Sequence, residues 1–291
     1  MTHKKDSSKP PVPIPFPFNL IPRVFPWLEK FATPLANRLT VLLFFSPLRF
    51  KTPKKEQEAA EQSKSVVLTV SGKKIQAYLW GEEGPTILMS HGWSGRGTQF
   101  RKFVQPFTEA GLRVLAFDGP AHGKSQGRQT HIVDFYDVIS VLNQRFGPFK
   151  AMIGHSFGGV VNTYALINGV STDKMIMISS PTIGQDVIDD AIKKMNGSPE
   201  RGEYLKKYVI RKYNVDFDDL SILKMIEDVT DTPLLLIHDR NDKEVPLKHP
   251  NSLLAKYPKA RLIETEGLGH IRILKSPQVV KYALDFILDK N

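Results

Sequence analysis

The chain has 291 residues, 41% of them hydrophobic and 24% charged, which suffices for one large domain or two small ones with a sizeable core. The absence of cysteine excludes disulfides, thiolate metal sites and cysteine nucleophiles, and it fits a reducing, cytoplasmic compartment. The net charge of +10 is uneven, because residues 1–64 hold eleven Lys/Arg against five Asp/Glu. The rest of the chain is only mildly basic, so we expect no nucleic-acid partner.

Proline dominates the start of the chain, where ten of the 21 prolines fall within the first 53 residues. In residues 10–18 proline alternates with apolar side chains, which predicts an extended arm; a proline-rich ligand for an aromatic groove is the alternative. Residues 28–45 favour helix in pieces, with a break at Pro34 and an end before Ser46. Residues 51–64 are charged and polar and predict a linker. Residues 1–64 are therefore expected to form a proline-rich, basic arm with a helical extension.

The uncharged run at residues 39–48 is too short to cross a bilayer, which needs about 20 apolar residues. Two interpretations stay open for this segment. It either packs on the body as an extra helix or lies on a membrane surface beside its basic flanks. The second interpretation would make the protein a peripheral membrane protein.

The body alternates short apolar runs with helical patterns, which predicts an α/β fold: a mostly parallel central sheet with helices on both faces. The first two runs flank a four-residue turn and predict an antiparallel hairpin. Residues 65–180 and 232–291 are expected to form this core. Strands are predicted at 66–70, 75–80, 86–89, 113–117, 151–153, 174–178, 233–237 and 261–263, and helices at 99–110, 130–146 (capped by Thr130), 159–167, 250–256 and 277–288.

Between residues 181 and 231 the alternation stops and only helical patterns remain. Three are predicted, at 185–195, 198–213 and 218–227, with Ser198 as the N-cap of the second. An insertion of this length exceeds a plain connection, so we expect a small all-helical cap beside the site. Most of its apolar side chains are expected to pack inside the cap.

Residues 154–158 (GHSFG) match the pattern G-x-S-x-G between a predicted strand and a predicted helix. A serine at such a sharp turn adopts strained dihedral angles, and its glycine neighbours lack the β-carbon that would keep the backbone from closing. The helix that follows favours negative charge at its start. Ser156 is therefore a candidate nucleophile, with a structural serine as the alternative.

A serine nucleophile needs a base and an acid that orients the base. Asp239 and Asp242 follow the strand at 233–237, and His270 follows the strand at 261–263. Parallel strands place such residues at one edge of the sheet. The chain order Ser, Asp, His is the order of the α/β-hydrolase fold.

Four short sequence motifs resemble those of the α/β-hydrolase superfamily, and in particular of its bacterial esterase-like members: residues 91–95 (HGWSG), 118–125 (DGPAHGKS), 154–158 and 267–270 (GLGH). The resemblance covers about residues 66–288. It implies that Ser156 is the nucleophile, His270 the general base, and Asp242, rather than its rival Asp239, the acid.

An oxyanion hole takes two backbone N–H donors. The residue after the nucleophile, Phe157, supplies one of them. The resemblance gives Trp93 as the other.

These residues predict a serine hydrolase that acts on small to medium carboxylic esters without a cofactor. A thioesterase, a lactonase or a perhydrolase would use the same triad, and a non-catalytic binding protein of the same fold is the alternative from another class. Serine at the turn argues against dehalogenases and epoxide hydrolases of this superfamily, which place aspartate there. The histidines lack paired spacing such as H-E-x-x-H, so no metal site is expected.

Overall fold

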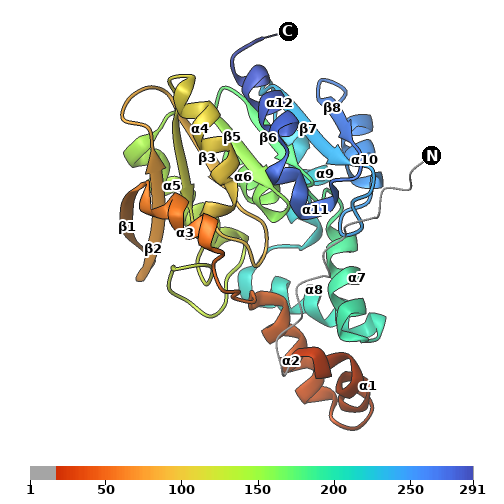
Figure 1. Cartoon of the computed structure of the whole chain (residues 1–291). Coiled ribbons are helices and arrows are strands. Elements are labelled where there is room, and N and C mark those ends of the chain that lie inside the picture. The colour runs from red at the N-terminus through yellow and green to blue at the C-terminus, as the bar shows by residue number, and fades with distance from the viewer. Residues whose placement is uncertain (1–17, 291) are drawn as a thin grey trace, which may run out of the picture.

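The computed structural model describes residues 18–290 as an eight-stranded sheet with helices on both faces (Figure 1). The strand order is β1-β2-β4-β3-β5-β6-β7-β8. β2 is antiparallel to both β1 and β4, and all other neighbours are parallel. The predicted hairpin and mostly parallel sheet are therefore confirmed. The strands are β1 (Lys64–Val70), β2 (Lys73–Trp80), β3 (Thr86–Ser90), β4 (Arg113–Phe117), β5 (Phe149–His155), β6 (Met175–Ile178), β7 (Leu234–Asp239) and β8 (Arg261–Thr265).

Helices cover the sheet, and a second group gathers at one end of it. Most of the proline-rich prediction, residues 10–17, lies outside the described residues. No helix within residues 18–290 is both long and apolar enough to cross a membrane. The α-helices are α1 (Ile21–Phe31), α2 (Thr33–Phe45), α3 (Lys54–Glu61), α4 (Arg101–Glu109), α5 (Ile132–Phe146), α6 (Phe157–Ile167), α7 (Gly184–Met195), α8 (Pro199–Tyr213), α9 (Ile222–Met225), α10 (Lys248–Lys256), α11 (Gly269–Arg272) and α12 (Pro277–Ile287).

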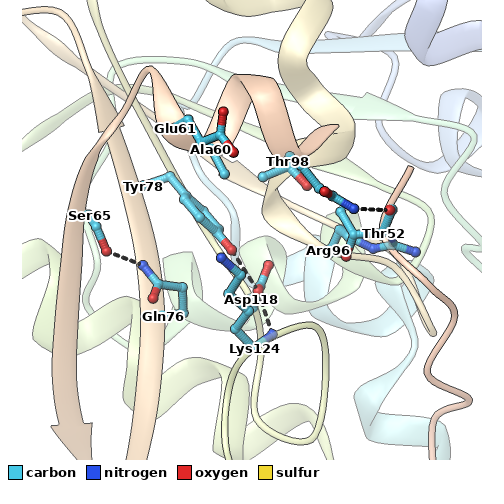
Figure 2. Close-up of a pocket in the computed structure, with 11 residues that line it drawn as sticks. Thr52, Ala60, Glu61, Ser65, Gln76, Tyr78, Arg96, Thr98, Asp118 and Lys124 are labelled. Atoms are coloured by element: carbon cyan, nitrogen blue, oxygen red, sulfur yellow. Dashed lines mark hydrogen bonds between the residues drawn. The ribbon is translucent and has the colours of Figure 1, made fainter. Parts of the chain in front are cut away.

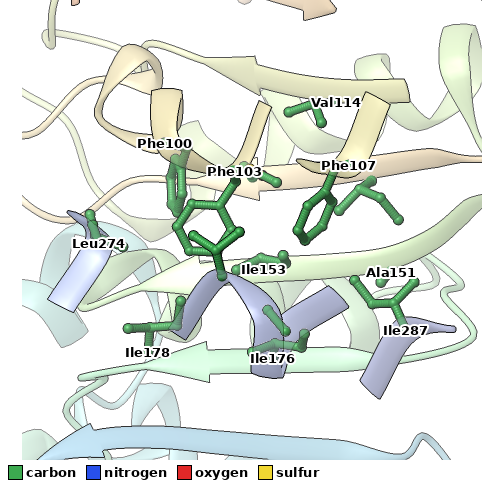
Figure 3. Close-up of a cluster of buried hydrophobic side chains, with 14 of the residues drawn as sticks. Phe100, Phe103, Phe107, Val114, Ala151, Ile153, Ile176, Ile178, Leu274 and Ile287 are labelled. Atoms are coloured by element: carbon green, nitrogen blue, oxygen red, sulfur yellow. The ribbon is translucent and has the colours of Figure 1, made fainter. Parts of the chain in front are cut away.

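Both faces of the sheet are buried, because successive side chains of a strand point to opposite sides. Ile153 of β5 faces α4 and α12, where Phe103 and Phe107 fill the space above the strands (Figure 3). Its neighbour Met152 faces the other way, into a cluster with Phe135 of α5. A strand buried on both faces carries a continuous apolar sequence, which explains why β5 was recognisable from the sequence.

The N-terminal helices and the insertion between β6 and β7 form one helical unit, below the sheet in Figure 1. Helices α1 and α2 pack against α7 and α8 and share an interior with them. We call this group of buried side chains the cap cluster: Phe25, Ala36, Phe45, Ile188, Ile192, Met195, Leu205 and Val209.

A polar contact also joins the two parts of this unit. Ser198 stands at the N-cap of α8, as predicted, but its side chain makes no capping bond. The carboxylate of Glu29, on α1, instead accepts hydrogen bonds from the Ser198 backbone N–H (3.0 Å) and hydroxyl (2.8 Å). Glu29 also pairs with Arg201 at 3.1 Å. A negative charge at the start of a helix is stabilising, so α1 supplies the cap that α8 lacks.

The expected linker at residues 51–64 is wrong, because this segment contains helix α3. Its buried face packs on the sheet edge, where Trp80 Nε1 donates to the carbonyl oxygen of Ala59 at 2.9 Å. Glu56, also buried, pairs with Arg96 at 3.4 Å. Apart from Glu56, the charged residues of α3 that suggested a linker occupy the solvent-facing side of a short amphipathic helix.

Three predicted helix details also differ. The break between α1 and α2 falls at Ala32, and Pro34 lies in the first turn of α2, where a missing N–H is tolerated. The side chain of His131, rather than Thr130, caps α5 by accepting from Asp134 N at 3.3 Å. The third helical stretch of the insertion breaks into α9 and two 3-10 turns, because Ser221 starts a new helix there.

Candidate active site

Ser156 occupies the sharp turn between β5 and α6. Its backbone has φ 53° and ψ −122°, a combination that costs a non-glycine residue about 1–3 kcal/mol. The two glycines of the motif let the backbone close around it. A β-carbon on Gly154 would lie 2.4 Å from the carbonyl carbon of Gly158, and one on Gly158 would lie 1.9 Å from Ser90 O. Close backbone contacts on both sides of the serine therefore require the two glycines of the motif.

His270 and Asp242 are joined across two neighbouring loops. His270 is the second residue of the short helix α11 after β8, and Asp242 lies in the loop after β7. His270 Nδ1 is 2.8 Å from Asp242 Oδ2, and both side chains are buried. The other oxygen of Asp242 accepts from the backbone N–H groups of Glu244 and Val245, each at 2.9 Å.

The electrostatic environment keeps Asp242 ionised. Burial alone would raise the pKa of its carboxyl, but the interaction with His270 and the hydrogen bond from the backbone of Val245 contribute to an opposing effect that holds that pKa below its usual value. An ionised carboxylate only accepts hydrogen bonds, so the proton of the His270 ring is on Nδ1. The other ring nitrogen, Nε2, is then free to act as a base.

The imidazole of His270 lies beside the turn that carries the serine. Its ring centroid is 4.9 Å from that of His155, the residue before Ser156. His155 Nε2 is also 2.8 Å from the carbonyl oxygen of His270. No hydrogen bond joins His270 to Ser156 among the described residues, and the Nε2 atom has Glu244 Oε2 at 3.9 Å instead. Sequence reasoning missed Glu244, because an exposed acid in a loop has no motif of its own.

Asp239, the rival acid, has a different set of partners. It accepts from Gly269 N (2.9 Å), Leu268 N (3.0 Å) and the hydroxyl of Thr265 (2.8 Å). Burial raises the pKa of Asp239, but these donors overcome that effect and lower it. Asp239 therefore holds the turn that carries His270, whereas Asp242 contacts the imidazole itself.

The loop after β3 passes directly over Ser156. A β-carbon on Gly92 would lie 2.9 Å from the β-carbon of Ser156. The aromatic rings of Trp93 and Phe157 pack edge to face at 5.4 Å, so the two residues expected to form the oxyanion hole are adjacent. Within the described part of the chain, the backbone N–H of Trp93 has no acceptor.

Two buried histidines hold this loop in place. His91 Nε2 accepts from Gly119 N at 2.9 Å, so its Nδ1 carries the proton and donates to Gly92 O at 2.7 Å. Burial lowers the pKa of His91 to about 4, which keeps it neutral. His122 Nε2 accepts from Ser94 N at 3.0 Å. His91 therefore holds its loop through hydrogen bonds.

A cavity of about 440 Å³ lies away from these residues, between α3, β2 and the loop after β4 (Figure 2). The hydroxyl of Tyr78 donates to Asp118 at 3.0 Å, and Gly97 N donates to the other carboxylate oxygen at 2.8 Å. Burial raises the pKa of Asp118, against the effect of its hydrogen-bond donors. Neither Ser156 nor His270 lines this cavity, so it is separate from the candidate site.

The helical insertion is attached to the start of α10 by polar contacts. Asp186 of α7 lies 2.6 Å from Lys248 Nζ and 3.3 Å from His249 Nε2. Thr182 N donates to the other ring nitrogen of His249 at 3.1 Å. Between residues 18 and 290 no group of three or more His, Asp or Glu side chains could hold a metal ion.

The strand order and the serine turn together define one class of fold, the α/β-hydrolases. Residues 87–281 match the model described as the alpha/beta hydrolase family, and the chain belongs to this family.

Individual relatives are distant. The chain is 30% identical over 125 residues to the human serine hydrolase-like protein, a match that covers 39% of this chain and 59% of that protein. It is 22% identical over 268 residues to the uncharacterized hydrolase YugF of Bacillus subtilis (strain 168), covering 75% and 96% of the two chains. The structure of the Pyrococcus furiosus esterase Pf2001 matches with a TM-score of 0.63 and 23% identity, over 84% of this chain and 96% of that one. This last likeness shows the shared fold alone.

Proposed function

We propose that this protein is a serine hydrolase that cleaves carboxylic esters of small to medium acyl chain through an acyl-enzyme intermediate. The observation that carries the proposal is the 2.8 Å contact between His270 and Asp242 beside a serine at positive φ. Ser156 is the nucleophile, His270 the general base and then acid, and Asp242 the group that orients the imidazole.

In the first half-reaction the Ser156 oxygen attacks the ester carbonyl carbon while His270 Nε2 takes the hydroxyl proton. The oxyanion that forms accepts hydrogen bonds from the backbone N–H groups of Trp93 and Phe157, each typically worth about 3–4 kcal/mol in the transition state. The C–O bond to the leaving group then breaks, and His270 returns the proton to give the alcohol.

Water completes the cycle. His270 removes a proton from a water molecule, whose oxygen attacks the acyl-enzyme. The bond to Ser156 breaks, the serine oxygen regains its proton, and the carboxylic acid leaves. In the resting protein Ser156 and His270 are not hydrogen-bonded, as is common before substrate binds, so a side-chain rotation must bring them together.

The cap supports a substrate of modest size. Three of its apolar side chains, Ile188, Ile192 and Met195, are buried in the cap cluster and are not free to line a long acyl channel. Relatives named as hydrolases agree with a hydrolytic reaction.

The test is hydrolysis of p-nitrophenyl acetate and butyrate by the wild type and Ser156→Ala. We expect kcat to fall by at least about a thousandfold in the variant, as when a nucleophile is removed from a triad. Ser71→Ala is a matched control, because Ser71 also has positive φ (45°) but lies in the β1–β2 turn; it should retain the wild-type rate. Equal rates for the wild type and Ser156→Ala would rule out the proposal.

A second pair of variants tests the assignment of the acid. Asp242→Asn should lower kcat by about 10⁴, the effect of losing the carboxylate partner of the base in a triad. Asp239→Asn should act mainly on stability, because Asp239 contacts the turn rather than the imidazole. A larger loss of kcat in Asp239→Asn would reverse the two roles.

A further inference from the structure

Helix α1 carries a second apolar stripe that no described residue covers. Its inner stripe, with Phe25 at its centre, is buried in the cap cluster. A second row of large apolar side chains is exposed along α1, starting at its N-cap residue. We call this row the outer stripe: Leu20, Val24, Trp27 and Phe31. Trp27 and Phe31 are 66% and 67% exposed and stack on each other at 5.6 Å.

Exposed apolar side chains are concentrated in this part of the protein. Six of the ten large exposed apolar residues within residues 18–290 lie between positions 20 and 42, the four of the outer stripe together with Leu35 and Leu42 of α2. Single exposed apolar residues are ordinary, but a contiguous group on one element marks a docking surface. The inner stripe anchors α1, so the outer stripe is presented on a fixed surface.

Within α1 and α2, every exposed charged side chain is positive. Arg23 and Lys30 of α1 and Arg38 of α2 are exposed, and no carboxylate of the described residues pairs with them. The one acidic residue of the two helices, Glu29, is turned inward to Ser198 and Arg201. Ahead of α1, the sequence of residues 1–17 adds three lysines against one aspartate.

Charge distinguishes between the occupants that could cover this surface. A second copy of the chain docked through the same face would bring these cations against their own counterparts, which is unfavourable. An anionic lipid surface complements both features, because its headgroups attract Arg and Lys while its acyl boundary takes up the apolar stripe. Tryptophan in particular prefers the boundary between water and lipid.

We propose that α1 and α2 form an interfacial anchor that docks the protein on anionic membranes through the outer stripe. The helices lie in the plane of the interface, since α1 has only 11 residues and cannot cross the bilayer. In Figure 1 these helices stand at the end of the molecule beyond α7 and α8, so docking would leave the sheet and its other helices in water. The proposal does not depend on catalysis by Ser156.

Co-sedimentation of the full-length Ser156→Ala protein with lipid vesicles tests the anchor, and this background prevents any hydrolysis of the lipid. One set of vesicles contains phosphatidylcholine alone, and the other contains equal parts of phosphatidylcholine and phosphatidylglycerol. We expect binding at least about tenfold tighter to the anionic vesicles, and weaker binding as salt is added. No sedimentation with anionic vesicles would overturn the proposal.

Two double variants separate the apolar and charged contributions. Trp27→Ser/Phe31→Ser should weaken binding by at least about tenfold, because two aromatic rings no longer enter the interface. Arg23→Gln/Lys30→Gln should lose about fivefold for each charge on anionic vesicles and little on phosphatidylcholine. The controls are Val67→Ser, an exposed apolar residue of β1, and Lys102→Gln/Lys275→Gln, two exposed cations of the core; both should bind like the parent protein.

Tryptophan emission locates the contact. Of the three tryptophans, Trp80 is buried and Trp93 is partly buried beside the candidate site, whereas Trp27 is exposed. Vesicles should therefore shift the emission of Trp27 to the blue. Trp27→Phe should lose the shift and keep most of the binding. Light scattering checks the alternative: if the protein is a dimer in solution and Trp27→Ser/Phe31→Ser is a monomer, the stripe is a subunit interface and the membrane proposal is wrong.

Discussion

The turn around Ser156 and the helical cap below the sheet are held together in different ways. At the turn, backbone meets backbone: an added β-carbon on Gly158 would lie 1.9 Å from the carbonyl oxygen of Ser90. In the cap, side chains meet side chains, and an added β-carbon on Gly202 of α8 would lie 3.1 Å from a methyl group of Ile188. A backbone contact cannot adjust, whereas a methyl group can move slightly. The difference places rigidity at the reacting groups and adaptable packing in the helices beside them.

Gly158→Ala and Gly202→Ala test this difference directly, since both glycines lie within helices. Gly158→Ala should cost at least about 4 kcal/mol of unfolding free energy, because its methyl group overlaps a fixed carbonyl. Gly202→Ala should stay within about 1 kcal/mol of wild type, because alanine's higher helix propensity offsets the tighter contact. Urea denaturation measures both. Equal destabilisation of the two variants would show that the turn and the cap are equally constrained.

The sequence was sufficient to predict the sheet, because its central strands are buried on both faces and carry continuous apolar runs between turn residues. The turn at Ser156 was also predictable, because the close backbone contacts beside the serine leave no room for a β-carbon and therefore require glycine. The union of α1 and α2 with α7 and α8 was not predictable. It depends on contacts such as Glu29 with Ser198, which are 169 positions apart and follow no spacing rule.

Phe25→Ala should have the next largest effect, and a local one. Phe25 is fully buried in the cap cluster, so removing its ring should cost about 3 kcal/mol. Hydrogen exchange should then show lost protection in α1, α2 and α7 while β5 remains protected. Trp27→Ala, two residues further along α1 but exposed, should change stability by less than about 0.5 kcal/mol. Lost protection in β5 would mean that the cap and the sheet unfold as one unit.

Lowering the pH should reduce the free energy of unfolding through two histidines that are buried beside the Ser156 turn. The effect of each is expected to be smaller than that of Phe25→Ala. Burial lowers the pKa of His91 to about 4 and of His155 to about 3. In the unfolded chain these imidazoles bind protons near pH 6.5, so the unfolded state gains protons first as the pH falls. Stability is therefore complete above about pH 6.5 and is lost toward pH 4.

The size of this loss can be measured at two pH values. Each imidazole should contribute about 1–2 kcal/mol of destabilisation at pH 5 relative to pH 7. Urea denaturation at both values gives the difference, and His155→Gln should reduce it by the contribution of one imidazole, about 1–2 kcal/mol. A difference that is unchanged in His155→Gln would assign the acid sensitivity to other groups.

The candidate site also contains residues that the sequence predicts and residues that it does not. Ser156 and His270 follow from the motif and from the carboxyl ends of parallel strands, where side chains of neighbouring loops converge. Chain position alone does not separate Asp239, at the end of β7, from Asp242, three residues later, and the preference for Asp242 came from the family resemblance. In the structure the two acids differ in their hydrogen-bond partners. The approach of Glu244 to His270 likewise depends on the conformation of a loop.

Covalent labelling most directly tests whether Ser156 is a nucleophile that His270 activates. The protein is incubated with a fluorophosphonate, which reacts with a serine oxygen only when that oxygen is activated by a base, and the adduct is located by peptide mass spectrometry. We expect one adduct, on Ser156, that is absent from Ser156→Ala and forms far more slowly in His270→Ala. An unlabelled Ser156 in the wild-type protein, or labelling at the same rate without His270, would contradict it.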